Sequence, residues 1–154
     1  MDGKDGRQRV LLMRRTLRPW KEAMRKAHDS KDRKSTQIKS RERVSAHGEV
    51  FTAEREVKAM CDLIPDWTGN VLEPACGNGN FLVEIARRKL AAGMDTVSTA
   101  STIFGVDIQA DNVEEARARL LETLPGTKEI LAHNIVVGDF LHPKGIWFLE
   151  EENL

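Results

Sequence analysis

Three acidic residues, Glu73, Asp107 and Asp139, each end a short apolar run, and the turn Gly77-Asn78-Gly79 follows the first of them. Glycine lets a backbone approach a ligand closely, and a helix that begins after such a turn presents free N–H groups to it. In a parallel sheet, ligands bind beyond the carboxyl ends of the strands, where an acid can accept hydrogen bonds from ribose hydroxyls. The pattern therefore predicts a pocket for a cofactor that contains a nucleoside.

The elements that position these residues follow from hydrophobic periodicity. Runs rich in β-branched residues predict strands, and apolar positions three and four apart predict helices. We expect a helix from Thr52, its N-cap, to residue 64, strands at 70–73, 102–108 and 134–139, a helix at 80–92, a flexible loop at 93–101, and a helix at 111–124 that a capping box opens. Alternating strands and helices build a parallel sheet through right-handed crossovers. The predicted fold class is α/β, with an incomplete, Rossmann-like parallel sheet of about three strands and flanking helices.

Charge divides the chain into two parts. Residues 1–43 hold 15 Lys and Arg against six Asp and Glu, whereas residues 44–154 hold nine against 18, so the zero net charge conceals a basic N-terminal part. Apolar spacing predicts a basic helix at 8–28, and charged residues predict an exposed linker at 29–43. We expect a basic helical arm at 1–43 and a compact domain at 44–154. The arm could contact DNA phosphates, although such a charge run also suits a solvated segment.

Cysteine, histidine and hydrophobic patterns exclude several classes of protein. Cys61 and Cys76 form no Cys-x-x-Cys pair, and the four histidines lack metal-ligand spacing, so we expect neither a disulfide framework nor a metal site. No apolar run reaches membrane-spanning length and no secretory signal is visible, so we expect a cytoplasmic protein. Cys76 lacks a suitably spaced base that would activate it as a nucleophile. No residue of the chain is predicted to be catalytic.

Two other interpretations of the glycine turn fit less well. Asn-Gly is a frequent hairpin turn, but residues with helical spacing, not a strand, follow Asn78-Gly79. A nicotinamide dinucleotide site requires a third glycine where Leu82 stands, and Asp107 comes later than the usual interval of about 20 residues. Dinucleotide binding is kept as the alternative for the cofactor.

The segment Leu72-Glu73-Pro74-Ala75-Cys76-Gly77-Asn78-Gly79-Asn80-Phe81-Leu82 resembles the S-adenosylmethionine loop of N6-adenine DNA methyltransferases, especially those of restriction-modification systems. Gly48-Glu49-Val50-Phe51-Thr52 resembles an upstream cofactor-binding motif of that family, Gly105-Val106-Asp107-Ile108 its ribose-binding strand, and Gly138-Asp139-Phe140-Leu141 its adenine-contacting turn. The motifs stand in the family's order over about residues 40–142. The resemblance implies the class I S-adenosylmethionine-dependent methyltransferase fold and S-adenosylmethionine as the cofactor.

The resemblance also implies a role for each matching residue. Asp107 would hold the ribose hydroxyls, and Ile108 would pack on the adenine ring. Asp139 would accept the adenine amino group, with Phe140 on the other face of the ring. The methionine portion and its sulfonium centre would contact seven further residues: Phe51, Thr52, Glu73, Ala75, Cys76, Gly77 and Gly79.

The chain departs from the family pattern in two places. Ala53 stands where the family has a proline after the threonine of the upstream motif. The Asn/Asp-Pro-Pro-aromatic loop, which grips the amino group of the flipped target base, has no counterpart, since the sequence contains no Pro-Pro pair. We therefore expect the S-adenosylmethionine-binding part of a DNA adenine-N6 methyltransferase, truncated or split, inactive alone and completed by a second chain. The alternative from another class is a non-enzymatic DNA-binding or interaction protein that uses the basic arm.

Overall fold

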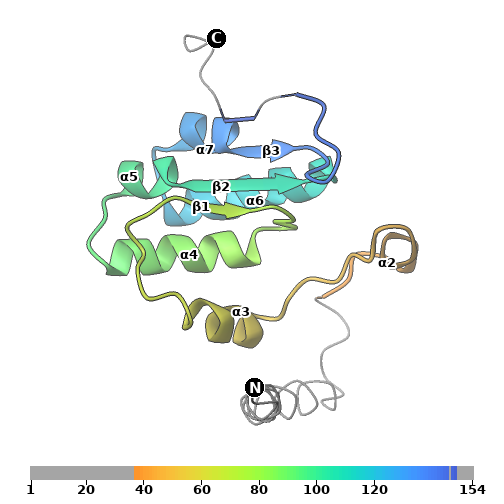
Figure 1. Ribbon diagram of the computed structural model, residues 1–154, viewed down its shortest axis with the longest axis horizontal. Coiled ribbons are helices and arrows are strands. Elements are labelled where there is room, and N and C mark those ends of the chain that lie inside the picture. The colour runs from red at the N-terminus through yellow and green to blue at the C-terminus, as the bar shows by residue number, and fades with distance from the viewer. Residues whose placement is uncertain (1–36, 146, 149–154) are drawn as a thin grey trace, which may run out of the picture. The chain divides into compact units, whose positions relative to one another are not determined.

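A computed structural model describes residues 37–145, 147 and 148, in which helices alternate with the strands of a small sheet (Figure 1). The elements in chain order are α2 (Arg41–His47), α3 (Glu54–Cys61), β1 (Val71–Glu73), α4 (Asn80–Ala91), α5 (Thr96–Ser101), β2 (Ile103–Asp107), α6 (Ala110–Thr123), α7 (Lys128–Asn134) and β3 (Ile135–Val137). The basic helix expected at 8–28 lies outside the described residues.

The three strands form one parallel sheet in the order β1-β2-β3. Val71 of β1 lies opposite Ile103 of β2, and Gly105 of β2 lies opposite Ile135 of β3. All three strands therefore end at the same edge of the sheet, as the sequence predicted. The predicted fold class is confirmed: an incomplete Rossmann-like α/β fold with a three-stranded parallel sheet and flanking helices.

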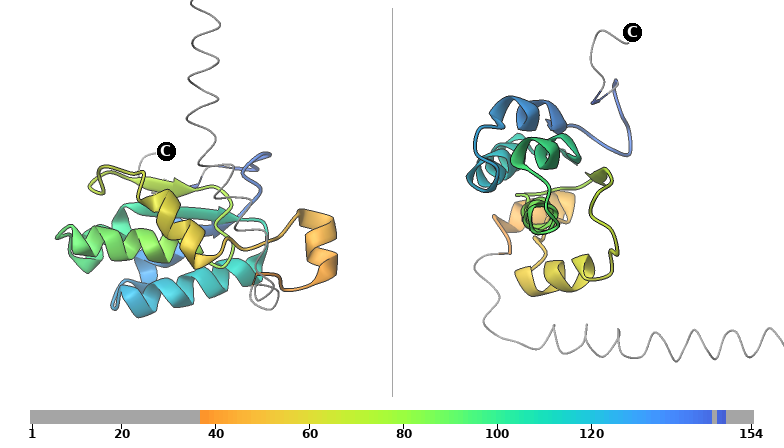
Figure 2. Two further views of the ribbon diagram at one scale, coloured as in Figure 1. Left: turned by 90° about the horizontal axis from the view of Figure 1, so that it is seen from below. Right: turned by 90° about the vertical axis from the view of Figure 1, so that its left-hand side faces the viewer.

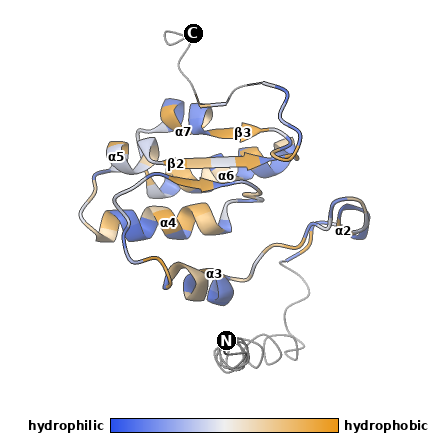
Figure 3. Cartoon of the chain, viewed as in Figure 1, coloured by the Kyte–Doolittle hydropathy of each residue, from blue (hydrophilic) through white to orange (hydrophobic). Residues whose placement is uncertain are grey.

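The core lies between one face of the sheet and the helices. Both α4 and α6 run along that face (Figure 2), and Figure 3 shows apolar strands beside helices with one apolar side. The largest part of this core consists of side chains with almost no exposed surface: Val57, Leu82, Ile85, Ala86, Ile103, Val113, Ala116, Leu120, Leu124, Leu131 and Ile135. Their burial is the main stabilising contribution to the fold.

The opposite face of the sheet is covered less completely. Because side chains alternate along a strand, the pairing register brings Leu72, Phe104, Val106 and Val136 to this face. Leu72 is still 43% exposed, while Phe148 contacts the Phe104 ring edge-on with centroids 5.1 Å apart. In the described part of the chain, β1 pairs only with β2, so its other edge carries unpaired backbone groups.

Three described helices, α2, α5 and α7, lie where the sequence predicted none. Residues 96–101, expected to belong to a flexible loop, form α5, which begins where the Asp95 carboxylate accepts the Ser98 N–H at 2.9 Å. The connection before the third strand contains α7. All three helices have six or seven residues, so their helical spacing involves too few turns to stand out in the sequence.

The predicted helix starts were also wrong in detail. The N-cap of α3 is Ala53, not Thr52, and that of α6 is Gln109, neither of which caps through its side chain. Asp111 therefore does not open a capping box. Its carboxylate instead pairs with Arg43 at 2.6 Å and Lys39 at 3.1 Å.

The linker expected to be exposed at 29–43 contacts the domain at its C-terminal end. Ser40 caps α2 by accepting the Arg43 N–H, and no residue of α2 is buried. Lys39 pairs with Glu115 at 2.8 Å and Arg43 with Glu49 at 2.6 Å. These cations are therefore engaged by carboxylates of the domain, while the division of the chain into arm and domain stays a prediction.

We expect Gly105→Ala to lower the free energy of unfolding by about 1–3 kcal/mol, as overpacking does in a filled core. A Cβ at Gly105 would lie 2.9 Å from Leu82 Cδ1 and 3.2 Å from Cys76 Cβ. Urea unfolding monitored by circular dichroism measures the change. Gly69→Ala is the matched control, because a Cβ there meets nothing within 4 Å, and its change should stay within about 0.5 kcal/mol. Unaltered stability of Gly105→Ala would contradict this packing.

Candidate cofactor-binding site

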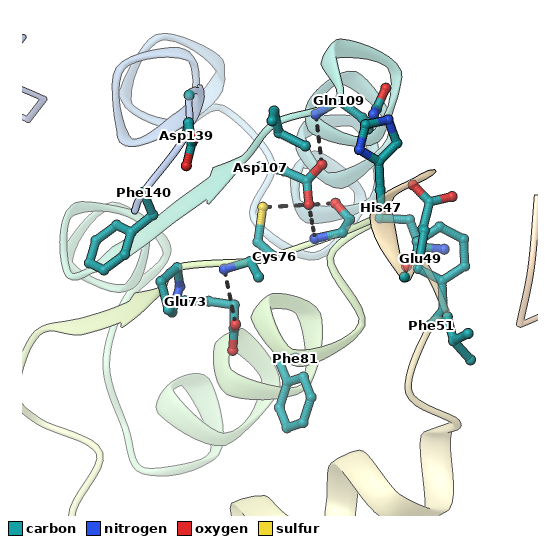
Figure 4. A pocket seen from close by; sticks show the side chains of 18 of the residues that line it. His47, Glu49, Phe51, Glu73, Cys76, Phe81, Asp107, Gln109, Asp139 and Phe140 are labelled. Atoms are coloured by element: carbon teal, nitrogen blue, oxygen red, sulfur yellow. Dashed lines mark hydrogen bonds between the residues drawn. The ribbon is translucent and has the colours of Figure 1, made fainter. Parts of the chain in front are cut away.

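A cavity of about 560 Å³ lies beyond the carboxyl ends of the strands (Figure 4). Its lining residues come from four separate stretches of sequence, within 47–52, 73–81, 107–109 and 138–142. Two of these stretches begin at the last residues of β1 and β2, and the last stretch begins directly after β3, which ends at Val137. The cavity has the size of a small-molecule site and the position that ligands take in open α/β sheets.

The cavity brings together ten of the eleven residues predicted for the cofactor: Phe51, Thr52, Glu73, Ala75, Cys76, Gly77, Asp107, Ile108, Asp139 and Phe140. Gly79, the eleventh, is not part of the lining. It is the N-cap of α4 with φ of 88°, and a Cβ there would lie 3.0 Å from Ala116 Cβ. Gly79 thus lets the turn pack closely against α6 and lies behind the wall of the cavity.

The glycine turn is held directly to the end of β2. The Gly77 N–H donates to Asp107 Oδ2 at 2.9 Å, and the Cys76 N–H donates to the Val106 carbonyl at 2.8 Å. Gly77 has φ of 51°, and a Cβ on it would lie 3.2 Å from the Phe51 ring. A side chain at position 77 would therefore be strained by the backbone and crowded by the aromatic wall.

Asp107 is oriented by three donors. Besides Gly77, the Gln109 N–H donates to its Oδ1 at 2.9 Å and Asn112 Nδ2 donates to the same oxygen at 3.2 Å. A carboxylate has about four acceptor positions, so capacity for a ligand hydroxyl remains. Figure 4 shows this carboxylate near the middle of the lining, between Gln109 and Cys76.

Burial raises the pKa of two side chains in the cavity wall, Glu73 and Cys76. It raises the pKa of the Glu73 carboxyl, which accepts a long hydrogen bond, 3.3 Å, from the Ala75 N–H. Burial, reinforced by the charges of Asp107 and Glu73, raises the pKa of the Cys76 thiol to about 12. A thiol of that acidity is protonated at neutral pH and is a poor nucleophile.

At the end of the cavity that follows β3, apolar side chains lie beside Asp139, whose Oδ2 lies 3.2 Å from His142 Nδ1. Ile108 and Phe140 are both partly exposed there, and the Phe140 ring stacks on Trp147 with centroids 6.2 Å apart. Asp139 Oδ1 accepts the Leu141 N–H at 3.0 Å. Apolar surfaces beside a hydrogen-bonded carboxylate suit a flat heteroaromatic ring with an exocyclic donor.

Two side chains that support the cavity wall, Glu49 and Asn112, were not predicted from the sequence. Asn112 Nδ2 donates both to Asp107 and, at 2.9 Å, to Glu49 Oε2. The place of Glu49 in the upstream motif was a sequence signal that could have indicated its role. Its contact with Asn112 could not be predicted from a local pattern, because 63 residues separate the two. Asn80 adds a further link, since its Nδ2 donates to the Thr52 carbonyl at 2.8 Å.

No group of three or more His, Cys, Asp or Glu side chains in the part of the chain that the structure describes is arranged to hold a metal ion. None of the helices described is long and apolar enough to cross a membrane.

Comparison with known proteins identifies the family. Searches of curated proteins and of solved structures gave no match. The family described as N-6 DNA methylase matches residues 37–140, which covers most of the chain and all four stretches that reach the cavity, apart from the last two residues of the lining. The chain therefore belongs to the N-6 DNA methylase family.

Proposed function

We propose that this chain binds S-adenosylmethionine and forms the cofactor-binding part of an adenine-N6 DNA methyltransferase of a restriction-modification system. Members of the family are S-adenosylmethionine-dependent methyltransferases that act on DNA. The observation that carries the proposal is the convergence of ten predicted cofactor residues, from four stretches of sequence, on one cavity at the strand ends. A nicotinamide cofactor remains the alternative that the binding experiment below distinguishes.

The chemistry of the lining fits each part of this cofactor. Asp107, whose orientation is set by the protein, offers an acceptor for ribose hydroxyls. Ile108 and Phe140 offer apolar surface for the adenine ring, and Asp139 an acceptor for its amino group. Glu73, without a cationic partner among its described contacts, suits the positively charged methionine portion. Gly77 leaves the space that a closely approaching ligand needs.

Methylation of a nucleobase requires a site for the methyl donor and a site for the base, and this chain supplies the site for the donor. When bound, S-adenosylmethionine provides an electrophilic methyl group on its sulfonium sulfur. The pocket residues bind and orient that group, but no residue of the 154 matches the loop that grips an extruded base. We propose that a segment outside these residues, in the same polypeptide or in a second chain, supplies the loop and pairs with the free edge of β1.

The proposal also covers how DNA is bound and where in the cell the protein acts. We propose that DNA is bound through the complete enzyme, with the basic arm, residues 1–43, as a further, non-specific contact, and that the protein acts in the cytoplasm. The non-enzymatic alternative would use the basic arm alone. Two of its cations, Lys39 and Arg43, are paired with Asp111, Glu115 and Glu49, which leaves fewer charges for phosphates.

We expect the wild-type chain to bind S-adenosylmethionine and S-adenosylhomocysteine in isothermal titration calorimetry. Asp107→Ala should cost about 1.5–3 kcal/mol of binding free energy, because it removes a charged acceptor for the ribose. Asp66→Ala, which removes an exposed carboxylate outside the cavity lining, should leave affinity unchanged. Tight binding of NAD without a signal for either S-adenosyl compound would overturn the assignment.

Glu73→Gln should stabilise the free protein and weaken its binding of the cationic cofactor. Since burial raises the Glu73 pKa, the carboxylate form costs folding free energy above that pKa, and the cost disappears as the pH falls through it. Urea midpoints of the variant should therefore exceed those of wild type most at alkaline pH and converge in acid. Glu114→Gln, on an exposed position of α6, should change neither stability nor affinity. A lower midpoint for Glu73→Gln at alkaline pH would refute the argument.

The purified chain alone should transfer no methyl group to DNA. Positioning of the target adenine against the methyl group can account for roughly 7–11 kcal/mol of barrier lowering. No segment of this chain matches the loop that would hold that adenine in place. The assay combines radiolabelled S-adenosylmethionine with unmethylated DNA, and a complete adenine methyltransferase serves as the positive control. Incorporation into adenine that is lost in Asp107→Ala would prove this prediction wrong.

A further inference from the structure

Asn112 joins two carboxylates beneath the cavity. The side chain lies in the first turn of α6 and only 1% of the residue is exposed. Its Nδ2 donates to Asp107 Oδ1 at 3.2 Å and to Glu49 Oε2 at 2.9 Å. A side-chain amide has two N–H donors, so one can serve each carboxylate. A neutral donor thereby separates two acids that would otherwise repel each other.

The bond to Asp107 differs from the other two bonds that this carboxylate accepts. Gly77 and Gln109 donate backbone N–H groups from the turns at the ends of β1 and β2. Asn112 is the single side-chain donor to Asp107 among the described residues, and it reaches the carboxylate from a helix. It can therefore be replaced without altering either turn.

The bond to Glu49 continues to the surface. Glu49 has a side chain only 9% exposed, and its Oε2 also accepts Arg43 Nη2 at 2.6 Å and Nε at 3.1 Å. The other end of the Arg43 guanidinium pairs with Asp111 at 2.6 Å, which holds the pKa of Asp111 well below its usual range. A chain of hydrogen bonds thus runs from the cavity through Asn112 to α2.

We infer that Asn112 is a positioning residue for the cofactor, which holds the Asp107 carboxylate toward the ribose and keeps Glu49 beside it without a net repulsion. The inference rests on the proposed function, because it assigns the ribose to Asp107. It extends the site to a buried residue that does not line the cavity.

The test replaces the Asn112 side-chain amide with a carboxyl group. In Asn112→Asp the new carboxyl group faces Asp107 from the end of β2 and Glu49 from the segment before α3. Arg43 pairs with Glu49 and Asp111, and Lys39 pairs with Asp111 and Glu115 on α6, so both cations are already engaged. Burial and like charges will raise the pKa of the introduced group.

Calorimetry with S-adenosylhomocysteine is performed at about pH 8 and about pH 5.5, on either side of the raised pKa expected for the new acid. At the higher pH, Asn112→Asp should bind at least roughly tenfold more weakly than wild type, which corresponds to about 1.4 kcal/mol. At the lower pH, protonation restores a neutral donor, and most of the lost affinity should return. Asn112→Leu, which has no donor, should bind weakly at both values.

The matched control is Asn134→Asp. Asn134 is also a buried asparagine on a helix, but its Nδ2 donates to the Ala100 carbonyl, away from the cavity. Its substitution should lower stability in urea unfolding and leave the pH dependence of cofactor affinity like that of wild type. The control therefore separates a general effect of a buried acid from an effect on the site.

Wild-type affinity of Asn112→Asp at the higher pH would overturn the inference, and so would a loss that is the same at both pH values. Should Asn112→Asp not fold, Asn112→Leu decides: unchanged affinity refutes the positioning role, and weak affinity in a folded variant supports it. Absence of binding by wild type itself would instead refute the proposed function.

Discussion

The hydrogen bond from the Gly77 N–H to the Asp107 carboxylate joins the ends of two neighbouring strands across 30 residues of sequence. Together with the bond from Cys76 N–H to the Val106 carbonyl, it continues the contact between β1 and β2 past the last paired residues. The turn must then leave toward α4 with a left-handed residue at 77, packed against the Phe51 ring. The direction of α4, the aromatic wall and the orientation of the Asp107 carboxylate all depend on this one junction.

The sheet is asymmetric in its packing, and this bears on the methyltransferase proposal. One face is buried under α4 and α6, while the other carries Leu72 and Phe104 with partial cover from Phe148. Parallel sheets normally have both faces covered, because their strands are apolar on both sides. An open edge at β1 and an apolar second face are what a further segment with a strand would cover. This agrees with the proposal that the base-gripping loop lies outside these 154 residues.

Polar contacts hold the segment before α3 together and join it to α6. The Phe51 N–H donates to the Gln37 carbonyl at 2.7 Å, and Gln37 Nε2 returns a bond to the Phe51 carbonyl at 3.1 Å. Exposed ion pairs such as those of Asp111 contribute only about 0–1 kcal/mol each. The bonds to the largely buried Glu49 matter more, because loss of a partner there leaves an uncompensated charge. The wall of the cavity and the position of α2 are thereby coupled.

Local patterns in the sequence determined much of this protein. Apolar runs ending in Glu73, Asp107 and Asp139 predicted three parallel strands and the edge at which they end, because strand alternation and burial act over a few residues. The glycine turn predicted the position of the cavity for a similar reason, since a left-handed backbone restricts residue type. Ten of the eleven predicted residues accordingly meet at one cavity.

Other features were decided only by the tertiary structure. The helices α5 and α7 form where short sequences gain packing partners, and Asp111 became an ion-pair partner of Arg43 instead of a cap. Gly79 serves contact with Ala116, and Asn112 meets Glu49 across 63 residues. Such contacts depend on which distant segments the fold brings together, and on the cost of leaving a buried polar group unpaired, neither of which is encoded in local spacing.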